Sequence, residues 1–101
     1  MKGNLFKIKE GKKDLWISWC QKLETIYKEE AILTLTEEKI KREIFFIFQI
    51  NQEYYTIGLK DVETGILQPN LQKEINIKHR EIGAECLIPL GKINKLYDLI
   101  V

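Results

Sequence analysis

The spacing of apolar residues divides the chain into segments with two different periods. Leu5 and Ile8 lie in a short apolar run that ends at Gly11, which predicts a β-strand over residues 3–9. From residue 12 onward, apolar residues recur at steps of three and four, so we expect an amphipathic helix. Its apolar face consists of Leu15, Trp16, Trp19, Cys20, Leu23, Ile26 and Tyr27.

The pattern leaves the end of this helix open. Apolar residues continue at helical spacing through Ala31 and Leu35, so the helix can run on beyond Tyr27. Thr34 and Thr36 are the expected break points, because a threonine followed by acidic residues is typical of the first turn of a new helix.

The clearest strand covers residues 42–50, and it is apolar on both of its alternating faces. A short turn at 51–53 and a return strand at 54–59 complete a predicted antiparallel hairpin. One face of the first strand carries Ile44, Phe46, Phe48 and Ile50, and the other carries Phe45 and Ile47.

The second half of the chain predicts a loop, a helix and a strand. Residues 60–70 are polar and favour a loop, and residues 71–84 have the period of a helix. Pro89 and Gly91 then interrupt the chain, and alternation over residues 93–101 predicts a final strand. The stripe of the second helix consists of Leu71, Ile75, His79, Ile82 and Cys86.

The resulting order is strand, helix, strand, strand, helix, strand. This βαββαβ order is the ferredoxin-like arrangement of the α+β class, in which two helices cover one face of a four-stranded antiparallel sheet. At 101 residues, we expect a single domain over residues 1–101.

Two helices can cover only one face of such a sheet. A strand that is half exposed to water alternates apolar and polar residues, but the strand at 42–50 does not, because Phe45 and Ile47 are as apolar as their neighbours. The strands at 54–59 and 93–101 also have apolar residues on both faces. We therefore expect a homodimer that pairs through the sheet face, with cover by loops and the N-terminus as the alternative.

The charge balance disfavours nucleic acid as a partner. The chain has 16 basic and 15 acidic residues, and the basic cluster of Lys39, Lys41 and Arg42 lies beside glutamates. Counterion release on nucleic acid requires an excess of clustered lysine and arginine.

The sequence also indicates the compartment. Residues 1–11 lack the apolar core of a signal peptide. The longest apolar run, 44–48, is far shorter than the about 20 residues that span a bilayer, so we expect no membrane association. Cys20 and Cys86 lie on helical apolar stripes, so we expect both to be buried free thiols, which favours a cytoplasmic protein.

Candidate chemistry centres on one histidine, because none of the standard catalytic motifs is present. His79 lies on an apolar stripe, where a histidine is more often a satisfied core residue than a catalyst. The functional alternative is an acid/base group or a ligand contact, since histidine titrates near neutral pH. One histidine with scattered carboxylates gives no defined metal site, so we expect neither a metal nor a cofactor.

Two carboxylates can reach a cavity between the helices and the sheet. Glu43 begins the strand at 42–50 and Glu38 precedes it, although a solvated charge at a strand end is the more common role of such residues. Glu85 lies six residues after His79, about 240° around the helix, so it does not orient His79 in a straight helix.

Trp16 and Trp19 point in different directions, because they are three residues apart on one helix. One of them can fill the core while the other forms a pocket wall. Core packing is the common role of both.

Short motifs along nearly the whole chain resemble a known family. These are Trp16-x-x-Trp19-x-x-x-Leu23, the run from Glu29 to Glu38, Glu43 at the start of an apolar strand, His79-Arg80-Glu81 and Glu85-Cys86-Leu87. Together they are similar to domain of unknown function 6176, a bacterial family of small single-domain proteins.

The resemblance implies a fold of the dimeric α/β-barrel type. That ferredoxin-like group includes cofactor-independent monooxygenases, stress-induced barrel proteins and small-molecule isomerases. It implies no established activity, because a fold does not determine a function. It places Glu38, Glu43, His79 and Glu85 at charged positions of the family pattern, which makes a pocket more credible.

Two hypotheses of function follow. The first is a small-molecule-binding protein or small cofactor-independent enzyme, with its pocket between the sheet and the helices. The second is a non-enzymatic homodimeric interaction module without a pocket. A cavity of several hundred Å³ that contains His79 favours the first. In that hypothesis His79 and Glu43 are the catalytic residues, and the ligand-binding residues are Glu38, Glu85, Trp16, Trp19 and Tyr55.

Overall fold

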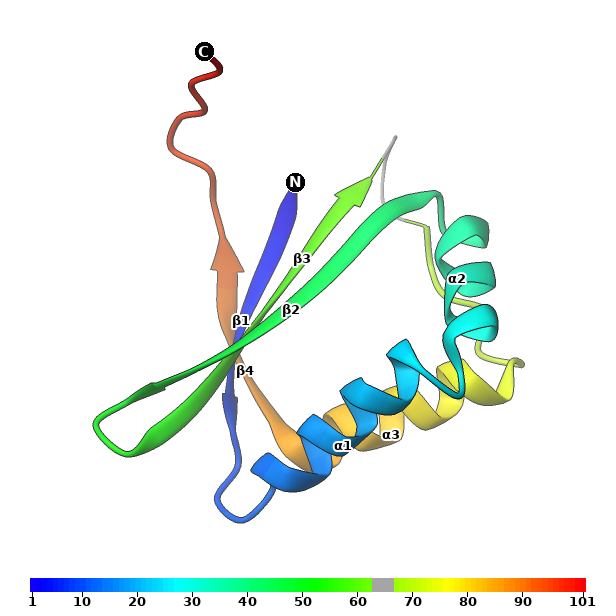
Figure 1. Cartoon of the computed structure of the whole chain (residues 1–101), viewed down its shortest axis with the longest axis horizontal. Coiled ribbons are helices and arrows are strands. Elements are labelled where there is room, and N and C mark those ends of the chain that lie inside the picture. Colours follow the sequence, from blue (N-terminus) through cyan, green and yellow to red (C-terminus); the bar gives the residue numbers. More distant parts are fainter. Residues whose placement is uncertain (63–66) are drawn as a thin grey trace.

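A computed structural model describes residues 1–62 and 67–101. Its four strands form one open antiparallel sheet in the order β2-β3-β1-β4, and its helices lie on one side of the sheet (Figure 1). This arrangement confirms the predicted α+β, ferredoxin-like fold. The elements are β1 (Lys2–Ile8), α1 (Lys13–Glu24), α2 (Lys28–Glu37), β2 (Ile40–Ile50), β3 (Glu53–Val62), α3 (Glu74–Cys86) and β4 (Leu87–Ile93).

The first predicted helix is two helices, and the expected break at Thr34 or Thr36 is wrong. The chain turns instead between α1 and α2, where the backbone N–H groups of Thr25 and Tyr27 both donate to the Lys22 carbonyl. Thr34 and Thr36 lie inside α2, and their hydroxyls donate to backbone carbonyls of the preceding turn and so do not cap a new helix. The turn lets α2 leave the line of α1 and approach the start of β2 (Figure 1).

The hairpin turn is one residue shorter than predicted. Asn51 and Gln52 form a two-residue turn with φ values of 49° and 70°, which suits the right-handed twist of the flanking strands. Glu53 is therefore the first residue of β3, paired with Ile50. Lys60, which was expected in a loop, is part of β3. Residues 63–66 of the predicted loop lie outside the described part of the chain.

The last strand lies earlier in the chain than predicted. Pro89 and Gly91, expected to interrupt the chain, are inside β4, at the edge of the sheet. Proline is tolerated at an edge, and a register shift between Leu5 and Phe6 accommodates the extra residue of β4.

The predicted strand at 93–101 is therefore wrong beyond its first residue. Ile93 pairs with Gly3, near the beginning of β1, so little of β1 remains for the following residues to pair with. Residues 94–101 project past the sheet without regular structure (Figure 1). Leu96 and Ile100 are 94% and 91% exposed, which shows that alternation alone does not make a strand.

The core lies between the helices and one face of the sheet. Its buried members are Ile8, Trp16, Trp19, Ile75, Cys86 and Leu87. Phe45 extends the core along β2, because its ring stacks on Phe6 and meets Trp16 edge-on at a centroid distance of 5.5 Å. Gly58 on β3 lies opposite Phe45 and leaves room for that ring.

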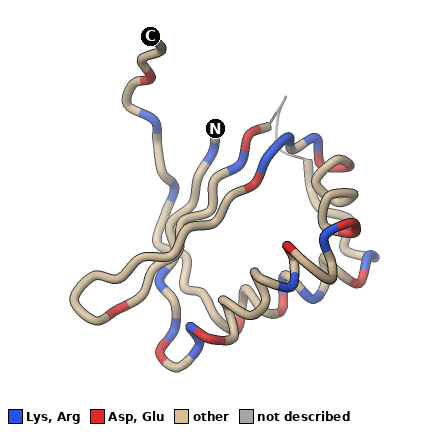
Figure 2. The backbone as a smooth tube through the Cα atoms, viewed as in Figure 1, with Lys and Arg blue, Asp and Glu red and all other residues tan. Residues whose placement is uncertain are grey.

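The other face of the sheet is apolar and has no helix over it. Phe46 and Ile50 on β2 are 54% and 51% exposed, and Phe48 stacks on Tyr55 across the hairpin. Figure 2 shows that the middle of β2 and β3 carries no charged residue, whereas both signs of charge are spread over the helices. The predicted second apolar face is thus present and uncovered within the described chain.

The longest helix of the described residues, α3, has 13 residues. None of the helices in that part of the chain is long and apolar enough to cross a membrane.

Two glycine substitutions test this packing. A Cβ at position 58 would lie 2.5 Å from the Phe45 ring, so Gly58→Ala should displace that ring from Trp16 and lower the free energy of unfolding by about 1–3 kcal/mol. Gly83, inside α3, has open space around it, so Gly83→Ala should raise that free energy by about 0.5–1 kcal/mol. Urea denaturation of both variants measures the difference. Equal effects of the same sign would contradict the packing of Phe45 over Gly58.

Candidate functional site

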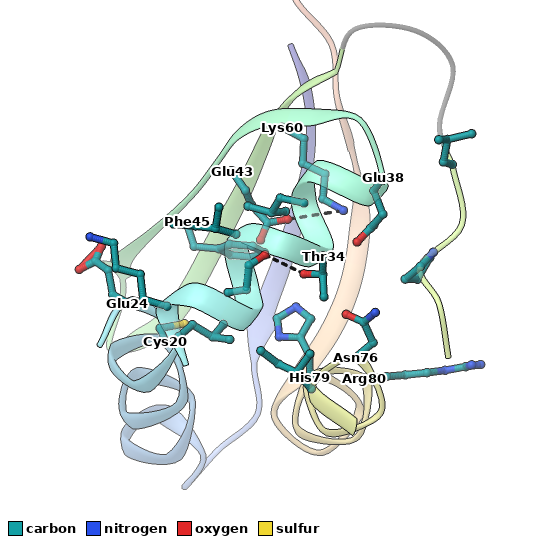
Figure 3. Close-up of a pocket in the computed structure, with 18 of the residues that line it drawn as sticks. Cys20, Glu24, Thr34, Glu38, Glu43, Phe45, Lys60, Asn76, His79 and Arg80 are labelled. Carbon is teal, nitrogen blue, oxygen red and sulfur yellow. Dashed lines mark hydrogen bonds and ion pairs between the residues drawn. The ribbon is translucent and has the colours of Figure 1, made fainter. Parts of the chain in front are cut away.

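A cavity of about 770 Å³ lies between the three helices and the helix-facing side of β2 and β3 (Figure 3). Its volume is within the range of about 300–1,000 Å³ that is typical of ligand pockets. Apolar side chains, among them Leu23, Ala31, Phe45 and Ile75, form much of its wall. Its polar lining includes Cys20, Thr34, Glu38, Glu43, Lys60 and His79.

Trp19 holds His79 in place at this cavity. The Trp19 indole Nε1–H donates a hydrogen bond of 2.8 Å to Nδ1 of His79, which joins α1 to α3. An indole nitrogen only donates, so Nδ1 accepts, and the proton of the neutral imidazole lies on Nε2. In Figure 3 the ring rises from α3 into the cavity, on the side where Thr34 and Glu43 lie.

The surroundings of His79 favour its neutral form. Burial lowers the pKa of His79 below its ordinary value of 6.5, because the imidazolium loses its hydration. The Glu43 carboxylate opposes this shift and the Lys60 ammonium adds to it. At neutral pH the cavity therefore contains an uncharged imidazole.

Glu43 and Lys60 form an ion pair across the hairpin. They are direct partners in the β2–β3 register, and the Lys60 Nζ lies 3.6 Å from a Glu43 Oε (Figure 3). The Glu43 side chain is 20% exposed, so this pair lies partly out of water. It provides a negative and a positive group side by side in the lining.

Glu38 faces the same region from the end of α2. Burial raises the pKa of its carboxyl group, the Glu43 charge raises it further, and the Lys60 charge lowers it. Within the described residues, no cationic side chain lies within 4.0 Å of the Glu38 carboxylate. Its charge is therefore less compensated than that of Glu43.

The cysteines are free thiols, as predicted. Burial, with a smaller contribution from the Glu43 charge, raises the pKa of Cys20 to about 12. Cys20 lines the cavity but stays protonated at neutral pH, so it is not an activated nucleophile. Cys86 is fully buried in the core.

The structure brings three of the predicted site residues together. His79, Glu43 and Glu38 all line the cavity, although they come from α3, β2 and the end of α2. Trp16 and Trp19, considered as pocket walls, are instead 3% and 2% exposed in the core. Trp19 affects the cavity through its bond to His79 and not as a lining residue.

Two other predicted ligand contacts lie away from the cavity. Tyr55 points to the open face of the sheet, opposite to its neighbours Thr56 and Gly58, and its hydroxyl donates to Glu53. Glu85 pairs with Lys12 at 2.9 Å, because it lies on another side of α3 from His79. Neither residue contributes to this pocket.

Sequence reasoning missed several lining residues. Asn76 and Arg80 lie three residues before and one residue after His79, a helical spacing that places them on one side of α3. Lys60 was missed because it was assigned to the predicted loop at 60–70, which hid its pairing with Glu43. Figure 3 shows Arg80 extending outward while Asn76 and Lys60 lie closer to the cavity.

The lining offers hydrogen-bond donors and acceptors. In the described part of the chain, no three His, Cys, Asp or Glu side chains are grouped in a way that could hold a metal ion. The polar groups of the lining include a neutral imidazole N–H, the Glu38 and Glu43 carboxylates, the Lys60 ammonium and the Asn76 amide.

Comparison with known proteins identifies one family. A family model described as a family of unknown function, DUF6176, matches residues 2–97 of the chain. No curated protein and no solved structure matches it.

The half-buried His79 predicts a loss of stability in acid. Its pKa in the folded state is below 6.5, whereas the unfolded chain has the ordinary value. The unfolded state therefore binds more protons as the pH falls below about 6.5, and the free energy of unfolding decreases over this range. Denaturation at about pH 7.5 and 5.5 should show a larger decrease for the wild type than for His79→Asn.

The comparison between the wild type and His79→Asn isolates the contribution of His79 to the pH dependence of the free energy of unfolding. The raised pKa of Glu38 acts with the opposite sign, but it is common to both and cancels in the difference. Asparagine keeps an oxygen that accepts from Trp19. Equal pH dependence in the two proteins would show that His79 titrates as it does in water.

Proposed function

The chain belongs to the DUF6176 family, and we propose that it binds a small molecule in the cavity between the sheet and the three helices. The observation that carries this proposal is the orientation of His79. The core residue Trp19 fixes one of its ring nitrogens and leaves the other for the cavity. A merely structural histidine needs no cavity beside it.

The composition of the lining supports the proposal. Ligand pockets are mostly apolar, with a few polar groups that fix orientation. Here the apolar wall is combined with Glu38, Glu43, Lys60 and His79. A ligand of this site would have an apolar body and a polar group that meets these side chains.

The same groups would suit a small enzyme that needs no cofactor. The Nε2–H of His79 would donate to the substrate, and Glu43 or Glu38 would accept a proton. Glu43 is held by Lys60, whereas burial raises the pKa of Glu38 toward the range of a general base. We infer ligand binding from the cavity. If the protein is an enzyme, proton transfer is the reaction type that this lining favours.

A pair of variants on one helix tests ligand binding. The wild-type protein, purified under mild conditions, should carry a bound small molecule in native mass spectrometry. In His79→Ala, the ligand loses its hydrogen bond and affinity should fall about tenfold, while the fold is retained. Glu81→Ala changes an exposed side chain of α3 outside the lining and should behave as the wild type.

The competing interpretation predicts a different result. If His79 only completes the core, His79→Ala should unfold the protein or lower its unfolding midpoint markedly. Wild-type protein without any bound compound, together with an unfolded His79→Ala variant, would refute the ligand-binding proposal.

A second proposal concerns association. We propose that the chain forms a homodimer through the open face of its sheet, because this face is apolar and uncovered within the described chain. The exposed apolar residues of 94–101 extend past the end of β4 and would add surface to the same contact. A self-complementary patch of this kind suits a two-fold pair.

The homodimer is tested by mass in solution. Light scattering at micromolar concentration should give twice the chain mass for the wild type. Phe46→Lys places a charge on the open face and should give a monomer, because a buried lone charge is costly. Ile26→Lys, at a residue 70% exposed on the helical side, is the matched control and should remain dimeric. A monomeric wild type refutes this proposal.

A further inference from the structure

We propose that the ligand presents an uncharged carbonyl oxygen, that of a ketone, ester or amide, to Nε2 of His79, and that Trp19 is the positioning residue behind this choice. The inference rests on the proposed ligand-binding function and names the class of ligand. It depends on the hydrogen bond between Trp19 and His79 and on the charges that face the imidazole.

The tautomer determines which ligand atoms His79 can bind. With Nδ1 occupied as an acceptor at 2.8 Å from the indole nitrogen, the neutral ring carries its proton on Nε2. The other tautomer, or the imidazolium, would direct an N–H at the indole N–H and lose this bond. Nε2 is therefore a donor, and its partner must be an acceptor.

The charges that act on His79 favour a neutral acceptor over an anionic one. The charges that act on His79 are those of Glu43 from β2 and Lys60 from β3, and both also act on Glu38 after α2. The rest of the lining adds one acidic residue, Glu24, and two basic residues, Lys28 and Arg80. Lys60 already lies 3.6 Å from Glu43. A carboxylate ligand would meet two carboxylates and one shared ammonium, whereas a neutral carbonyl avoids that repulsion.

The remaining groups near His79 do not replace its role. The Thr34 hydroxyl already donates to the Ala31 carbonyl, so its oxygen remains only as an acceptor. Arg80 also lines the cavity, but its guanidinium is a charged donor and not a neutral one. The Asn76 amide is in the same lining, and it already donates to the Asn70 carbonyl. His79 is thus the neutral donor of the lining whose direction is fixed by a hydrogen bond to the core.

The tautomer is measured directly, because His79 is the only histidine of the chain. A long-range proton–nitrogen NMR spectrum of the full chain, made without a histidine tag, should show Nε2 protonated and Nδ1 unprotonated at neutral pH. Trp19→Phe removes the indole donor and should give a mixture of tautomers. A role of Trp19 in packing alone would not change the tautomer. A protonated Nδ1 in the wild type would overturn the inference.

Ligand class is tested with four probes of one size. Acetophenone, benzoate, 1-phenylethylamine and ethylbenzene share a phenyl ring and differ in the group attached to it. In NMR titrations, acetophenone should shift the His79 Nε2–H resonance and bind about tenfold more tightly than ethylbenzene. The same preference should disappear in His79→Asn, which keeps an acceptor for Trp19 but has no group at the Nε2 position.

Each outcome of the titrations decides one claim. Stronger binding of benzoate or the amine, or a carbonyl preference that survives in His79→Asn, overturns the inference while ligand binding stands. Equal affinities for ethylbenzene and acetophenone would also overturn the inference while ligand binding stands. If none of the four probes perturbs the lining residues, the proposed ligand-binding function fails, and the inference fails with it.

Discussion

The hydrogen bond between Trp19 and His79 joins the core to the cavity. Trp19 is among the largest fully buried side chains, so its indole position is fixed by packing on all sides. Through Nε1 it fixes a ring on another helix, 60 residues away in sequence. The orientation and tautomer of His79 are therefore properties of the core, and any change that repacks α1 against α3 also changes the lining.

Much of the fold could be predicted, because most elements have one clear hydrophobic period. The hairpin and both apolar faces of β2 follow from alternation alone. The failures share a cause in tertiary context. Residues 94–101 alternate as a strand does, yet Ile93 has already paired near the beginning of β1, and the break between α1 and α2 depends on backbone bonds to Lys22 that leave no sequence signature.

The candidate site was predictable only in part, for reasons of register and direction. Position on a stripe was enough to single out His79, but Tyr55 shows that one step along a strand moves a side chain to the opposite face. The position of Lys60 is just as sensitive to the register of the hairpin. Because the turn has two residues and not three, Lys60 pairs with Glu43. Trp19 was predicted as a pocket wall or a core residue, and only the three-dimensional contact reveals that it orients His79.

The alternation of β2 also links the two faces of the sheet. Glu43 and Phe45 point toward the helices, and Ile44 and Phe46 point the other way, so one backbone segment serves both sides. β2 is an edge strand, restrained by hydrogen bonds on one side only. A second copy packed on the open face would restrain the strand that carries Glu43, and a ligand at Glu43 would restrain the strand that carries Phe46. If both proposals hold, ligand binding and dimerisation are linked, and each changes the affinity of the other by the same factor.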